Sequence, residues 1–243
     1  MKSLNQIRML SLLLLAVGLH FSVNAQDLKG AWEAEYTSEK GVAVRSVVIF
    51  ADGFQVNTIY AQTDGAFIST NGGLWSLEGN TLTETVEFDT DYPERVGSSI
   101  SFAIDLQEES LKIVGRDQVW KRLDKGGPGD LAGAWLISGR VRNGVMQKRD
   151  TNRPRKTMKI LSGTRFQWIA YNTETKQFMG TGGGTYTTLD GKYTENIEFF
   201  SRDNTRVGAS LEFNYALENG DWRHSGKSSK GSPIDEIWSL RRI

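Results

Sequence analysis

Cysteine is absent from the 243-residue chain. Its absence excludes disulfides, thiolate metal ligands, cysteine nucleophiles and a lipid anchor on an N-terminal cysteine. Histidine is scarce too, because His224 is the only one after residue 25. One histidine cannot supply a metal site built from two histidines and a carboxylate. We therefore expect no metal and no bound cofactor.

Long apolar runs are also scarce. The sequence has one, over residues 9–19, which follows a short basic start and precedes the small residues at 23–25. The run is too short to span a bilayer comfortably and has the layout of a secretory signal. We expect residues 1–25 to be a cleaved signal peptide, with an uncleaved anchor helix as the alternative. The remaining chain is then periplasmic or secreted, with no integral membrane segment.

An excess of charge of either sign is lacking as well. The leader holds two of the 29 Lys and Arg residues and none of the 29 Asp and Glu residues, which leaves a net charge of about −2 on the rest. A nucleic-acid partner would require a basic surface. We therefore expect no nucleic-acid partner.

An internal repeat organises the rest of the chain. Residues 28–32 (LKGAW) recur as residues 131–135 (LAGAW). Four further motifs, which begin at Gly72, Thr83, Glu87 and Arg95, recur at an offset of 111 residues. A constant offset through separate motifs indicates a duplication. Aligning Phe54-Gln55 with Phe166-Gln167, at an offset of 112, places Val56 opposite Trp168.

The copies are separated by a connector rich in Gly and Pro. Residues 125–129 (KGGPG) have the composition of a flexible linker. This predicts one domain over residues 26–124 and a second over residues 130–243.

Each copy has the pattern of an all-β domain. Strand-like runs cover residues 46–50, 165–171, 185–188, 193–200 and 206–215, with turn sequences such as Asp190-Gly191 between them. No stretch after the leader shows a helical period of 3.6 residues. Many short strands at this spacing predict an antiparallel meander, closed as a barrel or folded as a sandwich.

Short motifs at the ends of each copy resemble those of lipocalin-type (calycin-like) domains. The copies open with Gly30-Ala31-Trp32 and Gly133-Ala134-Trp135, and they close with residues 119–122 (VWKR) and 237–241 (IWSLR). The resemblance implies two tandem small antiparallel barrels, each able to bind a small, partly apolar ligand. It also implies that an Arg of the last strand covers the Trp of the first. Fold alone does not fix function.

The second copy holds most of the candidate binding residues. His224 shares a strand face with Trp222 and aligns with Ile113, while Glu195 stands on the apolar face of its strand and aligns with Glu84. A carboxylate there needs a partner, and Arg206 and Arg95 are the candidates. The predicted ligand-binding set is Trp168, Tyr171, Tyr186, Glu195, Arg206, Trp222 and His224. Alternatively, the aromatic residues are core, the Glu–Arg pairs are structural and His224 bonds a backbone group.

Three functions remain open from the sequence. The first is an exported lipocalin-like protein that binds a small, partly apolar or carbohydrate-like ligand, mainly in the C-terminal domain. The second is a cofactor-free isomerase, lyase or hydrolase with Glu195 and His224 as acid–base residues. The third is a structural or interaction module of the cell envelope. A basic stretch at residues 148–156 is a solvated loop or, alternatively, a lid or gate for an anionic ligand.

Overall fold

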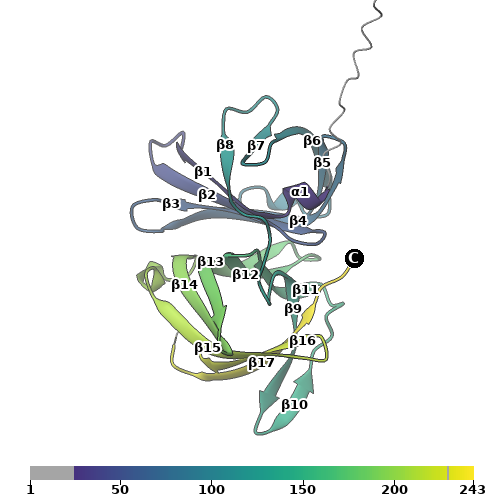
Figure 1. Ribbon diagram of the computed structural model, residues 1–243, viewed down its shortest axis with the longest axis vertical. Helices are drawn as coiled ribbons and strands as arrows, with labels where there is room; N and C mark the ends of the chain where they lie inside the picture. The colour runs from purple at the N-terminus through teal and green to yellow at the C-terminus, as the bar shows by residue number, and fades with distance from the viewer. Residues whose placement is uncertain (1–24, 229) are drawn as a thin grey trace, which may run out of the picture.

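The computed structural model describes residues 25–228 and 230–243, which form two β-barrels stacked on one another (Figure 1). The predicted signal peptide falls on residues 1–24, outside the described part, and on Ala25, so cleavage and export stay predictions. No helix in the described part is long and apolar enough to cross a membrane. The all-β fold class with two tandem antiparallel barrels is confirmed.

Barrel 1 is an eight-stranded meander that closes by pairing its first strand with its last. The four-residue helix α1 (Ala25–Leu28) precedes it, and the short 3-10 helix η1 (Pro93–Arg95) follows the fifth strand. Its strands are β1 (Gly30–Thr37), β2 (Ala43–Phe50), β3 (Phe54–Ala61), β4 (Phe67–Glu78), β5 (Thr81–Asp89), β6 (Ser99–Leu106), β7 (Ser110–Ile113) and β8 (Val119–Asp124).

Barrel 2 repeats this meander with one insertion. The extra strand, β10 (Val145–Lys148), pairs with the outer half of β9 and projects from the far end of the molecule (Figure 1). The barrel closes through β9 and β17. Its strands are β9 (Gly133–Arg142), β11 (Arg155–Leu161), β12 (Arg165–Asn172), β13 (Gln177–Leu189), β14 (Lys192–Phe200), β15 (Ser210–Glu218), β16 (Asp221–Lys227) and β17 (Pro233–Leu240).

The Gly-x-Trp motif anchors the start of each barrel in the same way. Trp32 Nε1 donates to the Leu28 carbonyl at 3.0 Å, and Trp135 Nε1 donates to the Leu131 carbonyl at 2.8 Å. Both rings are buried, so this bond satisfies a donor that would otherwise be costly to bury.

The arginine expected over this Trp is present only in barrel 1. Arg122 lies 3.8 Å from the ring centroid of Trp32, a cation–π contact. In barrel 2 the residue paired with Trp135 is Leu240, so the next residue, Arg241, points out of the barrel. The expectation for the second copy was therefore wrong. Its arginine is shifted by one residue along the strand, and a shift of one residue reverses the direction of the side chain.

The two barrels pack through a pseudo-twofold interface. Tyr60 Oη donates to Glu198 at 2.7 Å, and Tyr171 Oη donates to Glu87 at 2.7 Å. The two bonds are equivalent, because Tyr171 lies 111 positions after Tyr60 and Glu198 lies 111 positions after Glu87. Phe67 stacks on its own counterpart, Phe178, with 5.9 Å between ring centroids. A residue that contacts its own counterpart lies at the axis, as in an isologous dimer.

An apolar cluster and a partly buried ion pair reinforce this interface. Arg241 pairs with Glu87 at 2.6 Å between Nη2 and Oε1. The end of β8, next to the linker, is also bonded to barrel 2. The Asp124 carboxylate there accepts hydrogen bonds from Ser162 at 2.7 Å and from the Gly163 amide at 3.1 Å. The cluster contains, from both barrels, Ala31, Ile49, Ala51, Phe54, Val56, Phe88, Ala134, Leu136, Met158, Ile160, Ile169 and Tyr171.

Strand pairing corrects the alignment of the third strand in each copy. Phe50 pairs with Gln55, and its counterpart Leu161 pairs with Phe166, so the offset here is 111 and not 112. The counterpart of Trp168 is therefore Asn57, not Val56. A slip of one residue moves a side chain to the opposite face of the sheet, and Val56 does face the interface.

The strand predicted over residues 206–215 begins only at Ser210. Arg206 instead ends the 3-10 helix η2 (Asn204–Arg206). Asp203 caps this turn by accepting from the Thr205 amide, and Gly208 adopts a positive φ of 84°. These local features favour a turn, which outweighs the alternating apolar pattern.

Candidate functional site

The interior of barrel 2 contains a buried ion pair. Lys159 on β11 and Glu195 on β14 are 5% and 4% exposed, and Lys159 Nζ lies 2.7 Å from Glu195 Oε1. Arg206, the partner expected from the sequence, ion-pairs with Asp203 at 3.2 Å. Breaking a buried pair by removing one partner costs about 3–5 kcal/mol, so the two charges depend on each other.

Aromatic rings surround the Lys159 ammonium group. Its Nζ lies 4.8–5.8 Å from the centroids of four rings, all within the range of cation–π attraction. The rings belong to Tyr193, Trp222, Trp238 and Phe213. A carboxylate on one side and π faces on the others make this an internal ammonium-binding site, which the protein fills with its own side chain.

His224 lies in the same interior and is 3% exposed. Its Nδ1 is 3.6 Å from Glu236 on β17, and its ring is 5.8 Å from that of Tyr193. Burial, and then the charge of Lys159, lower the pKa of His224, so the neutral imidazole is favoured near pH 7. Burial opposes ionisation of Glu236, yet contacts with His224 and the charge of Lys159 lower the pKa of that carboxyl.

Several polar atoms in this interior have no hydrogen-bond partner among the described residues. They are Tyr193 Oη, Trp222 Nε1, Trp238 Nε1 and both ring nitrogens of His224. Buried polar atoms without partners are uncommon, and a group of them in one place marks a site able to bind polar groups.

The corresponding interior of barrel 1 is partly empty. A cavity of about 160 Å³ lies there, with an apolar lining that includes Phe50, Phe102, Ile104 and Trp120. Four more of its lining residues, Val48, Leu82, Leu111 and Ile113, are the counterparts of Lys159, Tyr193, Trp222 and His224. Each is smaller than its counterpart or less polar, so side chains that fill barrel 2 leave space in barrel 1.

Three polar side chains face this cavity. They are Asn57, Asn71 and Glu84. Glu84 is the counterpart of Glu195, but Val48 stands in place of its lysine, and within the described residues the Glu84 carboxyl has no hydrogen-bond or ion-pair partner.

The Glu84 carboxyl is consequently difficult to ionise. Burial, opposed in part by the charge of Arg95, raises its pKa from 4.5 to about 7, and the charge of Asp89 adds to the rise. Arg95, the partner expected from the sequence, ion-pairs with Asp89 at 2.7 Å.

The structure brings together some of the predicted ligand-binding residues and separates others. Glu195, Trp222 and His224 meet in the interior of barrel 2, and Trp168 packs at its edge, 5.6 Å from the Phe200 ring. Tyr186 also points inward, but its hydroxyl donates to the Ser162 carbonyl at 2.6 Å.

Tyr171 and Arg206 lie apart from this group. Tyr171 is in the barrel–barrel interface, and Arg206 is in the η2 turn. Strand parity separates Tyr171 from Trp168, three positions away, and could have shown this from the sequence.

Lys159 is the central residue that the sequence reasoning missed. A signal for it exists, because Lys159 interrupts the apolar run Met158–Leu161 at a position where the first copy has Val48. A lysine that replaces an inward-facing valine in one of two copies needs a buried counter-charge.

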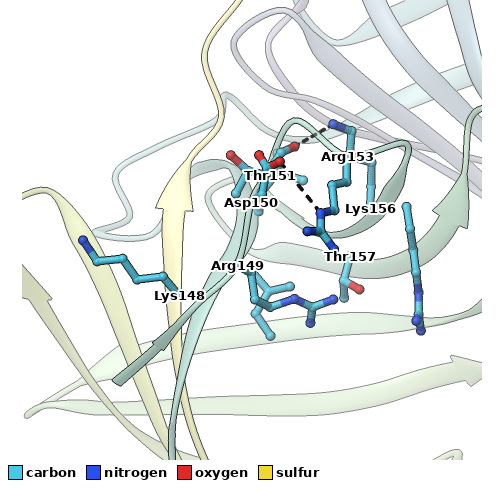
Figure 2. A pocket seen from close by; sticks show the side chains of 10 residues that line it. Lys148, Arg149, Asp150, Thr151, Arg153, Lys156 and Thr157 are labelled. Atoms are coloured by element: carbon cyan, nitrogen blue, oxygen red, sulfur yellow. Dashed lines mark hydrogen bonds and ion pairs between the residues drawn. The ribbon is translucent and has the colours of Figure 1, made fainter. Parts of the chain in front are cut away.

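A second pocket, of about 300 Å³, lies between β9, the start of β11 and the loop that joins β10 to β11 (Figure 2). Five cationic residues line it, with one acidic residue, Asp150, which is 3.8 Å from Arg153. The cationic residues are Lys148, Arg149, Arg153, Arg155 and Lys156. The basic stretch singled out in the sequence therefore forms a pocket wall.

Arg149 is, with Lys156, one of the two half-buried cationic residues of this wall. Its guanidinium has no hydrogen-bond or ion-pair partner in the part of the chain that the structure describes. Figure 2 shows it directed into the pocket beside Thr157, whereas Lys148 points away. Burial, and then the charges of Arg140 and Arg155, lower the pKa of Arg149, so the pocket concentrates positive charge.

The comparisons with known proteins concern mainly barrel 2. Residues 130–242 match a domain of unknown function, DUF4488. No curated protein matches the chain. Two closed eight-stranded antiparallel barrels fit a lipocalin-like fold. Among the described residues, no group of three or more His, Asp and Glu side chains is placed to hold a metal ion.

Proposed function

We propose that this is an exported, lipocalin-like binding protein that holds a small, partly apolar ligand inside barrel 1. The observation that supports it most directly is the cavity of about 160 Å³ with apolar walls and three polar side chains. Small-molecule sites combine these features. An engineered apolar cavity of about 150 Å³ binds benzene, so a ligand of that size fits.

The sequence alone favoured the C-terminal barrel, and the packing favours the N-terminal one. In barrel 2, Lys159 supplies the cation for Glu195, and the larger residues Tyr193 and Trp222 take up the space. In barrel 1 the corresponding anchor, Glu84, lacks a partner among the described residues and faces the cavity.

Catalysis by Glu195 and His224 receives less support. Both side chains face the interior of barrel 2, but Glu195 is held by Lys159 at 2.7 Å. A general base must be able to reach a substrate proton, and a carboxylate held in a buried ion pair is poorly placed to do so.

Thermal-shift and calorimetric titration of the full chain with toluene and benzyl alcohol tests the proposal. Leu111→Trp introduces the residue that barrel 2 has at the equivalent position, so we expect it to fill the cavity and abolish binding. Val114→Trp is the matched control, because Val114 is 62% exposed and close by in sequence. Failure of both probes to bind, or equal binding by Leu111→Trp and the native chain, contradicts the proposal.

The basic pocket favours a second candidate function, binding of an oxyanion. A half-buried guanidinium without a partner gains most from a carboxylate, sulfate or phosphate group, to which it can donate two hydrogen bonds. At constant ionic strength, we expect phosphate or sulfate to raise the melting temperature of the native protein and of Lys148→Gln. The increase should be lost in Arg149→Gln. Equal responses from all three proteins would show that the anions act without a specific site.

A further inference from the structure

We propose that the ligand of barrel 1 is a small organic amine, whose ammonium group pairs with Glu84 in the position that Lys159 Nζ occupies in barrel 2. This inference rests on the proposed function, since it names the chemical class of the ligand in the same cavity. It follows from a comparison within the molecule, because barrel 2 shows what the scaffold does with an internal ammonium group.

The interiors of the two barrels are equivalent around this carboxylate. Glu84 pairs across the sheet with Trp75, and Glu195 pairs with Tyr186, at matching positions of the repeat. Trp32 pairs with Val48, and Trp135 pairs with Lys159. The two carboxylates therefore occupy the same place in their barrels, and only barrel 2 places a lysine opposite.

In barrel 2 the side chain of Lys159 fills the ammonium-binding site. In barrel 2 the ammonium nitrogen lies 2.7 Å from Glu195 and 5.8 Å from the Phe213 ring. Another ring, Trp238, lies 5.4 Å away. Both rings have aromatic counterparts in barrel 1, Phe102 and Trp120, and both counterparts line the cavity. Barrel 1 thus keeps the carboxylate and two of the π surfaces but lacks the cation.

An ionised carboxyl that faces an apolar cavity without a partner is costly, and a ligand cation removes this cost by forming an ion pair. Burial raises the pKa of Glu84 to about 7, although the charge of Arg95 opposes the rise in part. A carboxylate or phosphate ligand would add a second negative charge in the same space. The site therefore discriminates in favour of amines.

The remaining wall of the cavity suits an apolar group on the ligand. Around Glu84 the cavity wall is formed by Val48, Ile104 and Ile113 among other apolar side chains. An alkyl or aryl group replaces water there favourably. The volume of about 160 Å³ limits this group to the size of one small ring or a short chain. A compact primary amine such as benzylamine combines both requirements.

Benzylamine and its neutral isostere benzyl alcohol test the inference by calorimetric titration of the full chain at pH 8. We expect the native protein to bind benzylamine at least about tenfold more tightly than benzyl alcohol. Glu84→Gln should remove this preference and still bind benzyl alcohol. Val48→Lys should lose benzylamine binding, because it supplies an internal ammonium group as in barrel 2.

The outcomes separate the two proposals. Binding of benzyl alcohol as tight as that of benzylamine overturns the amine assignment and leaves the proposed function standing. Absence of binding by either compound overturns the amine assignment, and it overturns the proposed function as well if toluene also fails to bind. If Val48→Lys does not fold, the comparison of Glu84→Gln with the native chain decides the question. Retention of the amine preference by Glu84→Gln contradicts the role given to that carboxylate.

Discussion

The same substitution, Glu to Gln, should have opposite effects on stability in the two barrels. Glu84 faces a cavity and has no hydrogen-bond or ion-pair partner among the described residues, and its pKa rises from 4.5 to about 7 on folding. Between these two pH values the folded protein keeps a proton that the unfolded chain releases. The stabilisation that the protonated Glu84 carboxyl gives to the folded state is fully present below pH 4.5 and is lost as the pH rises through 7.

The size of this effect follows from the shift. Each pKa unit corresponds to about 1.4 kcal/mol, so a rise from 4.5 to about 7 removes about 3 kcal/mol between pH 4.5 and 8. Glu84→Gln should abolish this loss, and its stability relative to the native protein should improve with rising pH. Glu195→Gln leaves Lys159 buried without a counter-charge and should destabilise the protein by about 3 kcal/mol at pH 8.

Urea unfolding followed by tryptophan fluorescence, at several pH values from 4.5 to 8, measures both effects. Subtracting the curve of each variant from that of the native protein removes the contribution of all other titrating groups. A Glu84→Gln variant that loses stability relative to the native protein as the pH rises would refute the reasoning. Equal effects of the two substitutions at pH 8 would also refute it.

Three further predictions follow from the interface and the cavity. Tyr60→Phe and Tyr171→Phe each remove a hydrogen bond to a carboxylate, that of Glu198 or Glu87, so each should cost about 1.5–3 kcal/mol in urea unfolding. Tyr171→Phe should cost more than Tyr60→Phe, because the Tyr171 hydroxyl also accepts from Arg241 at 3.2 Å, and no loss of stability in either variant would contradict the account of the interface. Asp124→Asn weakens the bonds to residues 162–164 and should speed amide exchange there, with no change expected if the linker were free. Benzylamine affinity should rise from pH 5.5 to 8 as Glu84 ionises beside Arg95 and Asp89, and a flat profile would exclude that group.

The architecture could be predicted from the sequence because it depends on repeated local signals. The Gly-x-Trp openings, the turn sequences and the 111-residue offset each determine a feature of the fold. The duplication therefore predicted two barrels, and both are present. The domain interface could not be read in this way, because it depends on how the outer faces of several strands from both barrels fit together in space.

The candidate site was only partly predictable for a related reason. Inward-facing residues such as Trp222 and His224 follow from strand parity, and both lie inside barrel 2. An alignment error of one residue in the third strand hid Asn57 as the counterpart of Trp168. Lys159 was missed because the partner of a buried charge comes from another strand, which only the closed sheet brings near.

A larger number of polar and aromatic side chains in one copy is therefore an incomplete guide to where a ligand binds. Barrel 2 has the histidine, the buried lysine and the larger inward-facing aromatic side chains, and these groups fill its interior. Barrel 1 has smaller aliphatic residues such as Val48 and Leu111 at the equivalent positions, and these leave the space that a ligand needs.

A crystal structure of the full chain with benzylamine tests the central claim most directly. The account predicts the ligand inside barrel 1, with its nitrogen about 2.7–3.2 Å from the Glu84 carboxylate and its ring against Val48 and Ile113. A ligand bound in barrel 2 or only on the surface, with the interior of barrel 1 unchanged, would contradict it.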